Sequence, residues 1–300
     1  MGQVDRDQAP GIDLAREDAA LARELRALGA GARLVFVAGL PGTGKTLVVR
    51  ELAAAACAAG RVVHLLQWDT LRPALEASPA GRPYPLVDGV THIVIRKAAG
   101  VWARRAVAAW QAAHPDPRHL LIGEAPLIGG RLIELARRMD DGAEPALGAP
   151  SCRFVVPVPS RAVRAFIEAE RDRRMARPAH PREREDAPSH VLRGLWAELA
   201  DVARRLGLAG ATPASAGTAP YDPAVYEAVY RHVLAHRHAT TLPLTRVLPV
   251  AGVSAYDLPV EARELLPTDR EAAASIRAVE AAYPDRATLA SEIERWYRGP

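Results

Sequence analysis

Lysine and asparagine are the residues that this sequence most clearly lacks. Of its 39 lysines and arginines only Lys45 and Lys97 are lysines, and it contains no asparagine. A GC-rich coding sequence accounts for most of this bias, and the 25 prolines also fit a thermophilic source. The net charge is only +4 and is spread along the chain. It therefore gives no support for a nucleic-acid partner, although it suits anionic substrates.

Cysteines and long apolar runs are also scarce. Cys57 and Cys152 are the only cysteines, too few for a disulfide framework, so we expect a reducing, cytoplasmic environment. The longest apolar runs are shorter than a membrane span, and no basic segment followed by an apolar one begins the chain. We therefore expect neither a membrane anchor nor an export signal. With 49% hydrophobic and 25% charged residues, the composition is typical of a folded globular protein.

Short apolar runs alternate with helical patterns along the chain. Runs rich in β-branched residues predict strands, and apolar residues at helical spacing predict helices. The predicted strands are 33–40, 61–69, 118–130 with its following loop, 152–160 and 240–250, and the main predicted helices are 12–28, 45–60, 90–115, 131–139, 161–177, 191–206, 222–237 and the tail from residue 269. This alternation indicates βαβ units, so we predict an α/β fold with a parallel sheet and helices on both faces.

A glycine-rich segment between the first strand and the next helix carries the clearest motif. Residues 39–46 read GLPGTGKT and match the pattern G-x-x-x-x-G-K-[ST] in full. Glycines let the backbone wrap a phosphate with its amide groups pointing inward, and the helix adds its positive N-terminal end. Lys45 can then reach the β- and γ-phosphates of a nucleotide, and the Thr46 hydroxyl can ligate Mg²⁺. The predicted nucleotide-binding residues are Gly39, Pro41, Gly42, Thr43, Gly44, Lys45 and Thr46.

The motif resembles the Walker A motif of the P-loop nucleoside triphosphatases, over about 30 of the 300 residues. The resemblance implies a three-layer P-loop fold with ATP and Mg²⁺ as cofactors. Within that superfamily the chain most resembles the nucleoside, nucleotide and shikimate-type small-molecule kinases, which implies the strand order 2-3-1-4-5.

Two acidic residues follow predicted strands, at the sheet edge where open parallel sheets bind their ligands. Asp69 ends the second strand and could accept a proton from a substrate hydroxyl, with Arg72 holding an anionic group of the same substrate. Glu124 follows four mostly apolar residues of the third strand, which resembles the Walker B pattern, and could hold Mg²⁺. Alternatively, Asp69 caps the next helix and Glu124 pairs with an arginine.

An arginine-rich stretch follows the fourth strand. It contains Arg171, Arg173, Arg174, Arg177, Arg182 and Arg184, with four acidic residues interleaved. The stretch resembles the lid of the small-molecule kinases, whose arginines close over the transferred phosphoryl group. Few apolar residues anchor it, so we expect residues 171–188 to move, and we predict Arg173 or Arg177 as the acting arginine. A solvated helix face is the alternative.

These features predict a kinase-like core at 1–206, with a helical acceptor-binding insertion at about 70–115, and a C-terminal strand and helices at 207–300 packed on the core. The predicted function is phosphoryl transfer from ATP to an unidentified small-molecule hydroxyl or phosphate, with Lys45, Asp69, Glu124 and Arg173 or Arg177 as catalytic residues. An ATP-hydrolysing switch or AAA-like ATPase, and a nucleotide-binding regulator without catalysis, are the alternatives. His232, His236 and His238 lack the companion residues of a metal motif.

Overall fold

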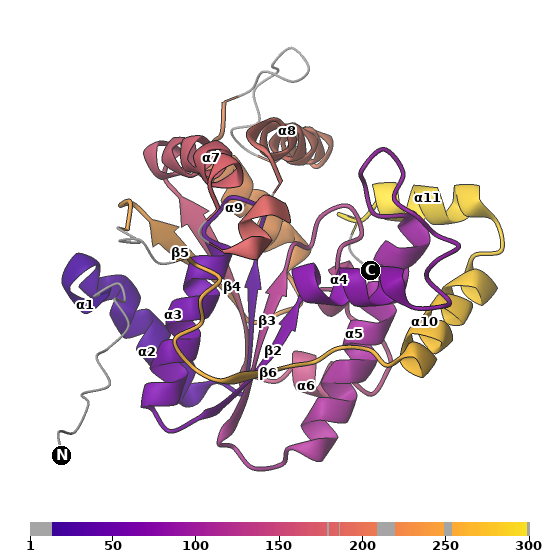
Figure 1. Ribbon diagram of the computed structural model, residues 1–300, viewed down its shortest axis with the longest axis horizontal. Helices are drawn as coiled ribbons and strands as arrows, with labels where there is room; N and C mark the ends of the chain where they lie inside the picture. Colours follow the sequence, from indigo (N-terminus) through magenta and orange to yellow (C-terminus); the bar gives the residue numbers. More distant parts are fainter. Residues whose placement is uncertain (1–13, 179, 186, 209–219, 249–253, 299–300) are drawn as a thin grey trace.

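Six parallel strands form one sheet at the centre of the protein (Figure 1). The computed structural model describes residues 14–178, 180–185, 187–208, 220–248 and 254–298. The strands lie in the order β5-β4-β1-β3-β2-β6, and every pairing is parallel. They are β1 (Leu34–Ala38), β2 (Val62–Gln67), β3 (His119–Ala125), β4 (Cys152–Pro159), β5 (Ala239–Leu244) and β6 (Ala262–Glu264). The predicted α/β class with a parallel sheet is confirmed, whereas β6 was not predicted.

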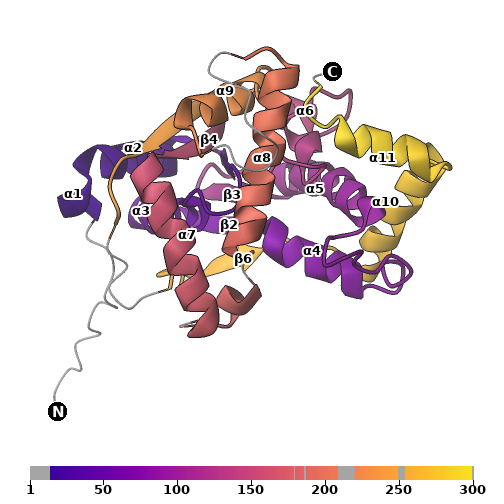
Figure 2. The ribbon, with the colours of Figure 1, turned by 90° about the horizontal axis from the view of Figure 1, so that it is seen from above.

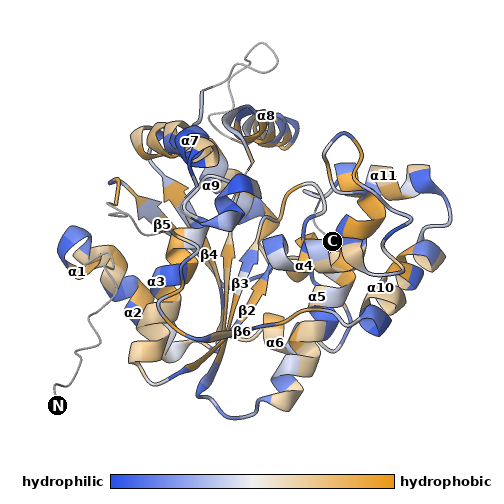
Figure 3. Ribbon diagram, viewed as in Figure 1, coloured by the Kyte–Doolittle hydropathy of each residue, from blue (hydrophilic) through white to orange (hydrophobic). Residues whose placement is uncertain are grey.

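Side chains of the central strands alternate between two hydrophobic clusters, one on each face of the sheet. In β1, Leu34, Phe36 and Ala38 belong to one cluster, while Val35 and Val37 belong to the other. All five residues are buried, as expected for a central strand covered on both faces. Figure 3 shows these strands as the apolar interior between helices with polar outer surfaces.

Helices cover both faces of the sheet (Figure 2). One face carries α1 (Leu14–Glu17), α2 (Ala19–Gly31) and α3 (Lys45–Ala58). The other face carries α4 (Trp68–Ala77), α5 (Ile93–Ala113), α6 (Glu144–Leu147), α8 (Ser189–Arg205) and α9 (Pro223–Val233). On this second face, α10 (Asp269–Ala282) and α11 (Arg286–Glu294) pack against α5. α7 (Arg161–Ala176) and α8 lie beyond the carboxyl ends of the strands, and the 3-10 helix η2 (Pro181–Glu185) contacts α7.

Two predicted boundaries need correction. The predicted helix 131–139 contains only the 3-10 turn η1 (Ile133–Leu135). The second strand ends at Gln67, because α4 begins with Trp68, so Asp69 lies in the first turn of a helix. α5 passes through Gly100 without a break; a Cβ at this position would overlap the carboxylate of Glu134, so the glycine permits a close approach between α5 and η1.

The C-terminal third completes the sheet. It supplies both edge strands, β5 and β6, and the helices α10 and α11. Between the two edges, residues 254–261 cross the α3 side, where Arg50 Nε donates a hydrogen bond of 3.0 Å to the carbonyl of Asp257 and Leu258 packs against the apolar cluster. Within the described ranges, no helix combines the length and apolar character needed to cross a membrane.

Candidate functional site

The glycine loop, residues 39–44, connects β1 to α3. Gly39, Gly42 and Gly44 adopt φ angles of 153°, 74° and 86°, which disfavour other residues. Gly44 precedes α3, and among the described residues no side chain caps the backbone amides of the first turn of this helix. These amides and the helix dipole favour an anion at this position. The loop thus has the backbone geometry of an anion-binding site.

Packing behind the loop explains two of the glycines. A Cβ on Gly39 would overlap the hydroxyl oxygen of Tyr226 in α9, and one on Gly42 would lie 2.9 Å from Leu192 Cδ1. Arg164, a buried residue of α7, donates a hydrogen bond of 2.8 Å to the carbonyl of Pro41. Helices beyond the sheet therefore fix the conformation of the loop from behind.

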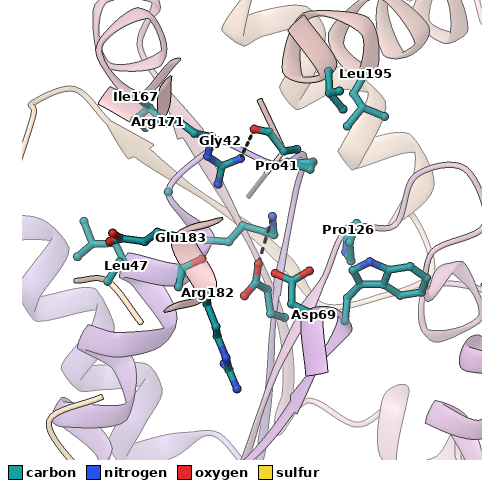
Figure 4. A pocket seen from close by; sticks show the side chains of 18 of the residues that line it. Pro41, Gly42, Leu47, Asp69, Pro126, Ile167, Arg171, Arg182, Glu183 and Leu195 are labelled. Atoms are coloured by element: carbon teal, nitrogen blue, oxygen red, sulfur yellow. Dashed lines mark hydrogen bonds and ion pairs between the residues drawn. The ribbon is translucent and has the colours of Figure 1, made fainter. Parts of the chain in front are cut away.

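Lys45 and Glu124 form a buried ion pair next to the loop. Lys45 Nζ lies 3.3 Å from Glu124 Oε1 and donates a hydrogen bond of 3.1 Å to the carbonyl of Leu40. Each residue is only 6% exposed. Burial raises the pKa of Glu124; the charge of Lys45 opposes this rise, and that of Asp69 adds to it. Asp69 is therefore close enough for its charge to act on the pair (Figure 4).

A cavity of about 650 Å³ lies over the carboxyl ends of the strands, a size typical of small-molecule sites. Of the predicted residues, eight line it: Pro41, Gly42, Gly44, Lys45, Thr46, Asp69, Arg72 and Glu124. Gly39 and Thr43 do not line it. Thr43 is fully buried and donates a hydrogen bond of 2.8 Å to the carbonyl of Leu40, so it shapes the loop instead.

The arginines that reach the cavity are not the two predicted. Arg171 and Arg174 of α7 line it together with Arg182 of η2, and Figure 4 shows Arg171 and Asp69 pointing toward the same space. Arg173 points away; its side chain is 67% exposed and pairs with Glu170 at 3.0 Å. Arg177 is exposed at the end of α7. One face of α7 lines the cavity, and helical spacing in the sequence marks this face. It carries Val163, Phe166, Ile167, Glu170, Arg171 and Arg174.

Polar contacts anchor the segment that follows α7. Glu183 is only 1% exposed; it accepts a hydrogen bond of 2.7 Å from Ser254 Oγ and pairs with Arg174 Nη1 at 3.6 Å. His180 stacks on Tyr256 with ring centroids 5.6 Å apart. We predicted a mobile segment because few apolar residues anchor it. That prediction did not take these polar contacts into account. Residues 179 and 186 lie outside the described chain.

A second basic region, missed at the sequence level, lines the cavity near Arg72. Arg131 follows β3, and burial lowers its pKa, with Glu198 opposing and Arg72 adding to this effect. Behind it, burial and the charge of Arg131 lower the pKa of Arg96 to about 10, and Arg96 Nη1 donates to the carbonyl of Gly129 at 3.0 Å. Concentrated positive charge here favours an anionic ligand.

Comparison with models of protein families, with curated proteins and with solved structures gives no match for this chain. The geometry of the site itself therefore carries the functional argument. It combines the glycine loop, a buried lysine, two carboxylates and two groups of arginines around one cavity.

Proposed function

We propose that this protein is an ATP-dependent kinase of the P-loop type that transfers a phosphoryl group to a small anionic acceptor. The glycine loop and Lys45 bind the β- and γ-phosphates, Thr46 and Glu124 hold Mg²⁺, and Asp69 accepts the proton of the acceptor. The bound Mg²⁺ supplies positive charge that neutralises the phosphates.

The juxtaposition of Lys45, Glu124 and Asp69 at the loop carries this proposal. Three separate strands lead to these residues: β1 through the loop, β3 and β2. Two features of the loop support phosphate binding. The N-terminal amides of α3 have no side-chain cap among the described residues, and Gly39 has no space for a Cβ, so the backbone keeps its conformation. Lys45 must exchange its contacts with Glu124 and the carbonyl of Leu40 for the phosphate oxygens when nucleotide binds.

The position of Arg72 and Arg131 favours an acceptor over water. The cavity extends from the loop past Asp69 to both arginines, so a second ligand beside the nucleotide would meet cationic side chains. Arginine binds phosphate and carboxylate groups through two parallel hydrogen bonds. An acceptor with such a group would be positioned with its hydroxyl near Asp69.

ATP hydrolysis coupled to a conformational change is the second candidate. One observation favours it: burial raises the pKa of Glu124, which makes this carboxylate a better base toward a water molecule. In that function Asp69 and the arginines would not contact a second substrate.

Release of ADP from Mg–ATP, measured with and without a panel of small phosphorylated and carboxylated alcohols, separates the two functions. For the kinase we expect ADP release at least about tenfold faster with one acceptor class, and stoichiometric phosphorylated product. Equal release with and without every acceptor would support the hydrolase. Failure of the protein to bind Mg–ATP would overturn both.

A further inference from the structure

A cluster of three histidines lies at the opposite end of the sheet from the glycine loop. His64 is in β2, His119 begins β3, and His114 follows the last turn of α5. β2 and β3 are neighbours in parallel register, with Val62 opposite His119. His64 and His119 thus project from adjacent strands toward the end of α5, although the three residues are separated by up to 55 positions in sequence.

The three imidazoles are close enough to share one ion. Their candidate ligand nitrogens all lie within 4.8 Å of one another, and His64 Nε2 is 2.9 Å from His119 Nδ1. The ring centroids of His114 lie 4.5 Å from His64 and 4.6 Å from His119. Two nitrogens bound at about 2.0–2.1 Å to one tetrahedral ion lie about 3.3–3.4 Å apart, so small rotations of the rings would bring the three nitrogens to metal-binding separations.

Neighbouring groups orient the ring of His114. Its Nδ1 lies 3.0 Å from the carbonyl oxygen of Trp110, a hydrogen bond that leaves Nε2 for the cluster. The indole of Trp110 stacks on His114 with centroids 5.4 Å apart and meets the edge of His64 at 5.6 Å. A backbone carbonyl that accepts the second N–H of a histidine is the usual outer partner of a metal ligand.

Charge around the cluster acts in both directions. The C-terminal end of α5, a helix of 21 residues, carries partial negative charge and favours a cation. The guanidinium of Arg33 lies 4.6 Å from the centre of the Trp110 ring, and its positive charge disfavours a bound cation. Arg33 Nη2 is buried without a hydrogen-bond partner among the described residues. An anionic fourth ligand on the metal would offset this charge.

We infer that His64, His114 and His119 form a site for one divalent transition-metal ion with an open fourth position, and that Zn²⁺ fits it best. Three imidazole ligands suit Zn²⁺ and exclude Mg²⁺ and Ca²⁺, which prefer oxygen. His114 and His119 are partly exposed, so the fourth position is open to solvent. The ion would join the end of α5 to β2 and β3, far from the nucleotide loop.

Titration calorimetry of tag-free, EDTA-treated protein with ZnCl₂ tests this site, and the absorption of Co²⁺ reports tetrahedral geometry. We expect one equivalent of Zn²⁺ to bind to the wild type and to raise its Tm. His114→Ala and His119→Ala, which replace partly exposed side chains, should each weaken binding at least about 100-fold. His236→Ala, an exposed histidine elsewhere, is the matched control and should bind as the wild type does.

Equal Zn²⁺ affinity in the wild type, His114→Ala and His119→Ala would overturn the site and leave a hydrogen-bonded trio. An equal loss in His236→Ala would also overturn it. Lys45→Ala should retain Zn²⁺ binding, because the two sites lie at opposite ends of the sheet. The metal site and the proposed kinase activity can therefore fail independently.

Discussion

Lys45 is buried and paired within the protein itself. Its ammonium contacts Glu124 and the carbonyl of Leu40, so the cation is held at the loop by the chain itself. Replacing Lys45 would remove the proposed phosphate ligand and also leave a buried carboxylate unpaired. Binding and stability should therefore both respond to this residue.

We expect Lys45→Ala to weaken Mg–ATP binding and to abolish transfer. The double variant Lys45→Ala/Glu124→Gln removes the unpaired carboxylate and should recover part of the lost Tm, while nucleotide binding stays lost. Calorimetry with Mg–ATP and thermal unfolding measure the two effects. Unchanged ATP affinity in Lys45→Ala would contradict the assignment of the loop.

Asp69 and Glu124 have different surroundings and should have separable roles. Asp69 is exposed at the cavity, whereas Glu124 is buried against Lys45. Asp69→Asn should keep Mg–ATP affinity and lower kcat by about 100-fold or more, because only proton acceptance is removed. Glu124→Gln should shift the Mg²⁺ concentration needed for half-maximal rate. Opposite results would exchange the two roles.

Gly39 is confined both by its φ angle and by Tyr226. Gly39→Ala should cost about 1–2 kcal/mol for the backbone conformation and about 1–3 kcal/mol more for the overlap with the tyrosine hydroxyl. Gly60→Ala is the matched control, because Gly60 has a φ of 75° and no atom within 4 Å of an added Cβ. Chemical denaturation measures both. Adding Tyr226→Phe should restore part of the stability of Gly39→Ala and none to Gly60→Ala.

At the scale of elements, one acidic residue of α6 joins α5 to the turn between α9 and β5. Glu144 pairs with Arg237 at 2.7 Å and with Arg104 at 2.9 Å, and the side chains of both arginines are almost fully buried. Hydrogen bonds from Arg237, and then from Arg104, lower the pKa of Glu144 from 4.5 to about 2 despite partial burial. The ionised carboxylate of Glu144 thus connects the helices α5 and α6 to the turn between α9 and β5.

The contribution of the Glu144 ion pairs to stability depends on pH, because the pKa of Glu144 is lowered. Glu144 is more acidic in the folded state than in the unfolded state, so it contributes stability above about pH 4.5, and this contribution is lost as the pH falls toward about 2. Glu144→Gln should lower the free energy of unfolding by about 3 kcal/mol at pH 7 and by much less near pH 2. Glu294→Gln, at an exposed position, is the control. A pH-independent difference would contradict this role.

Helices and strands with a regular apolar pattern could be predicted from the sequence, but a strand defined only by pairing with one neighbour could not. Apolar runs located β1 and β4 because a buried strand must be apolar on both faces. β6 has only three residues, and its sequence ARE contains no apolar pattern. Only its pairing with β2 makes it a strand, and this pairing cannot be read from the sequence. Helical spacing could have placed Arg171, but not Arg173, on the face of α7 that carries Val163 and Ile167, whereas packing decides that this face lines the cavity.

At the scale of the whole molecule, α7 and η2 form one wall of the cavity that the glycine loop also lines. Arg171 lines the cavity, and its charge, like that of Lys45, opposes the rise that burial causes in the pKa of Glu124, whereas Arg173 lies on the outer face of the same helix. If this wall closes on the γ-phosphate, only the inner arginine contributes.

Arg171→Ala should lower kcat by at least about tenfold with little loss of ATP affinity, because its partner charge develops in the transition state. The matched variant Arg173→Ala should stay within about twofold of the wild type. Hydrogen exchange should show protection of residues 171–185 on binding Mg–ATP. Equal exchange with and without nucleotide, or equal effects of the two substitutions, would contradict closure.

The sequence predicted the residues of the site near the loop because they follow strands directly. Lys45, Asp69 and Glu124 are placed by the sheet, whose strand ends must converge at one edge. Arg131 and the histidine cluster could not be predicted in this way. Their proximity depends on loops and on the length of α5, for which no local pattern exists.

Both edge strands of the sheet come from the last third of the chain, which has a consequence for folding. β6 pairs with β2 about 200 residues earlier, and closing so long a loop is slow. During synthesis the edges of β2 and β4 stay unpaired until the end of the chain is made, and unpaired edges promote aggregation. We therefore expect slow refolding and a need for chaperones, although the glycine loop itself is encoded near the start.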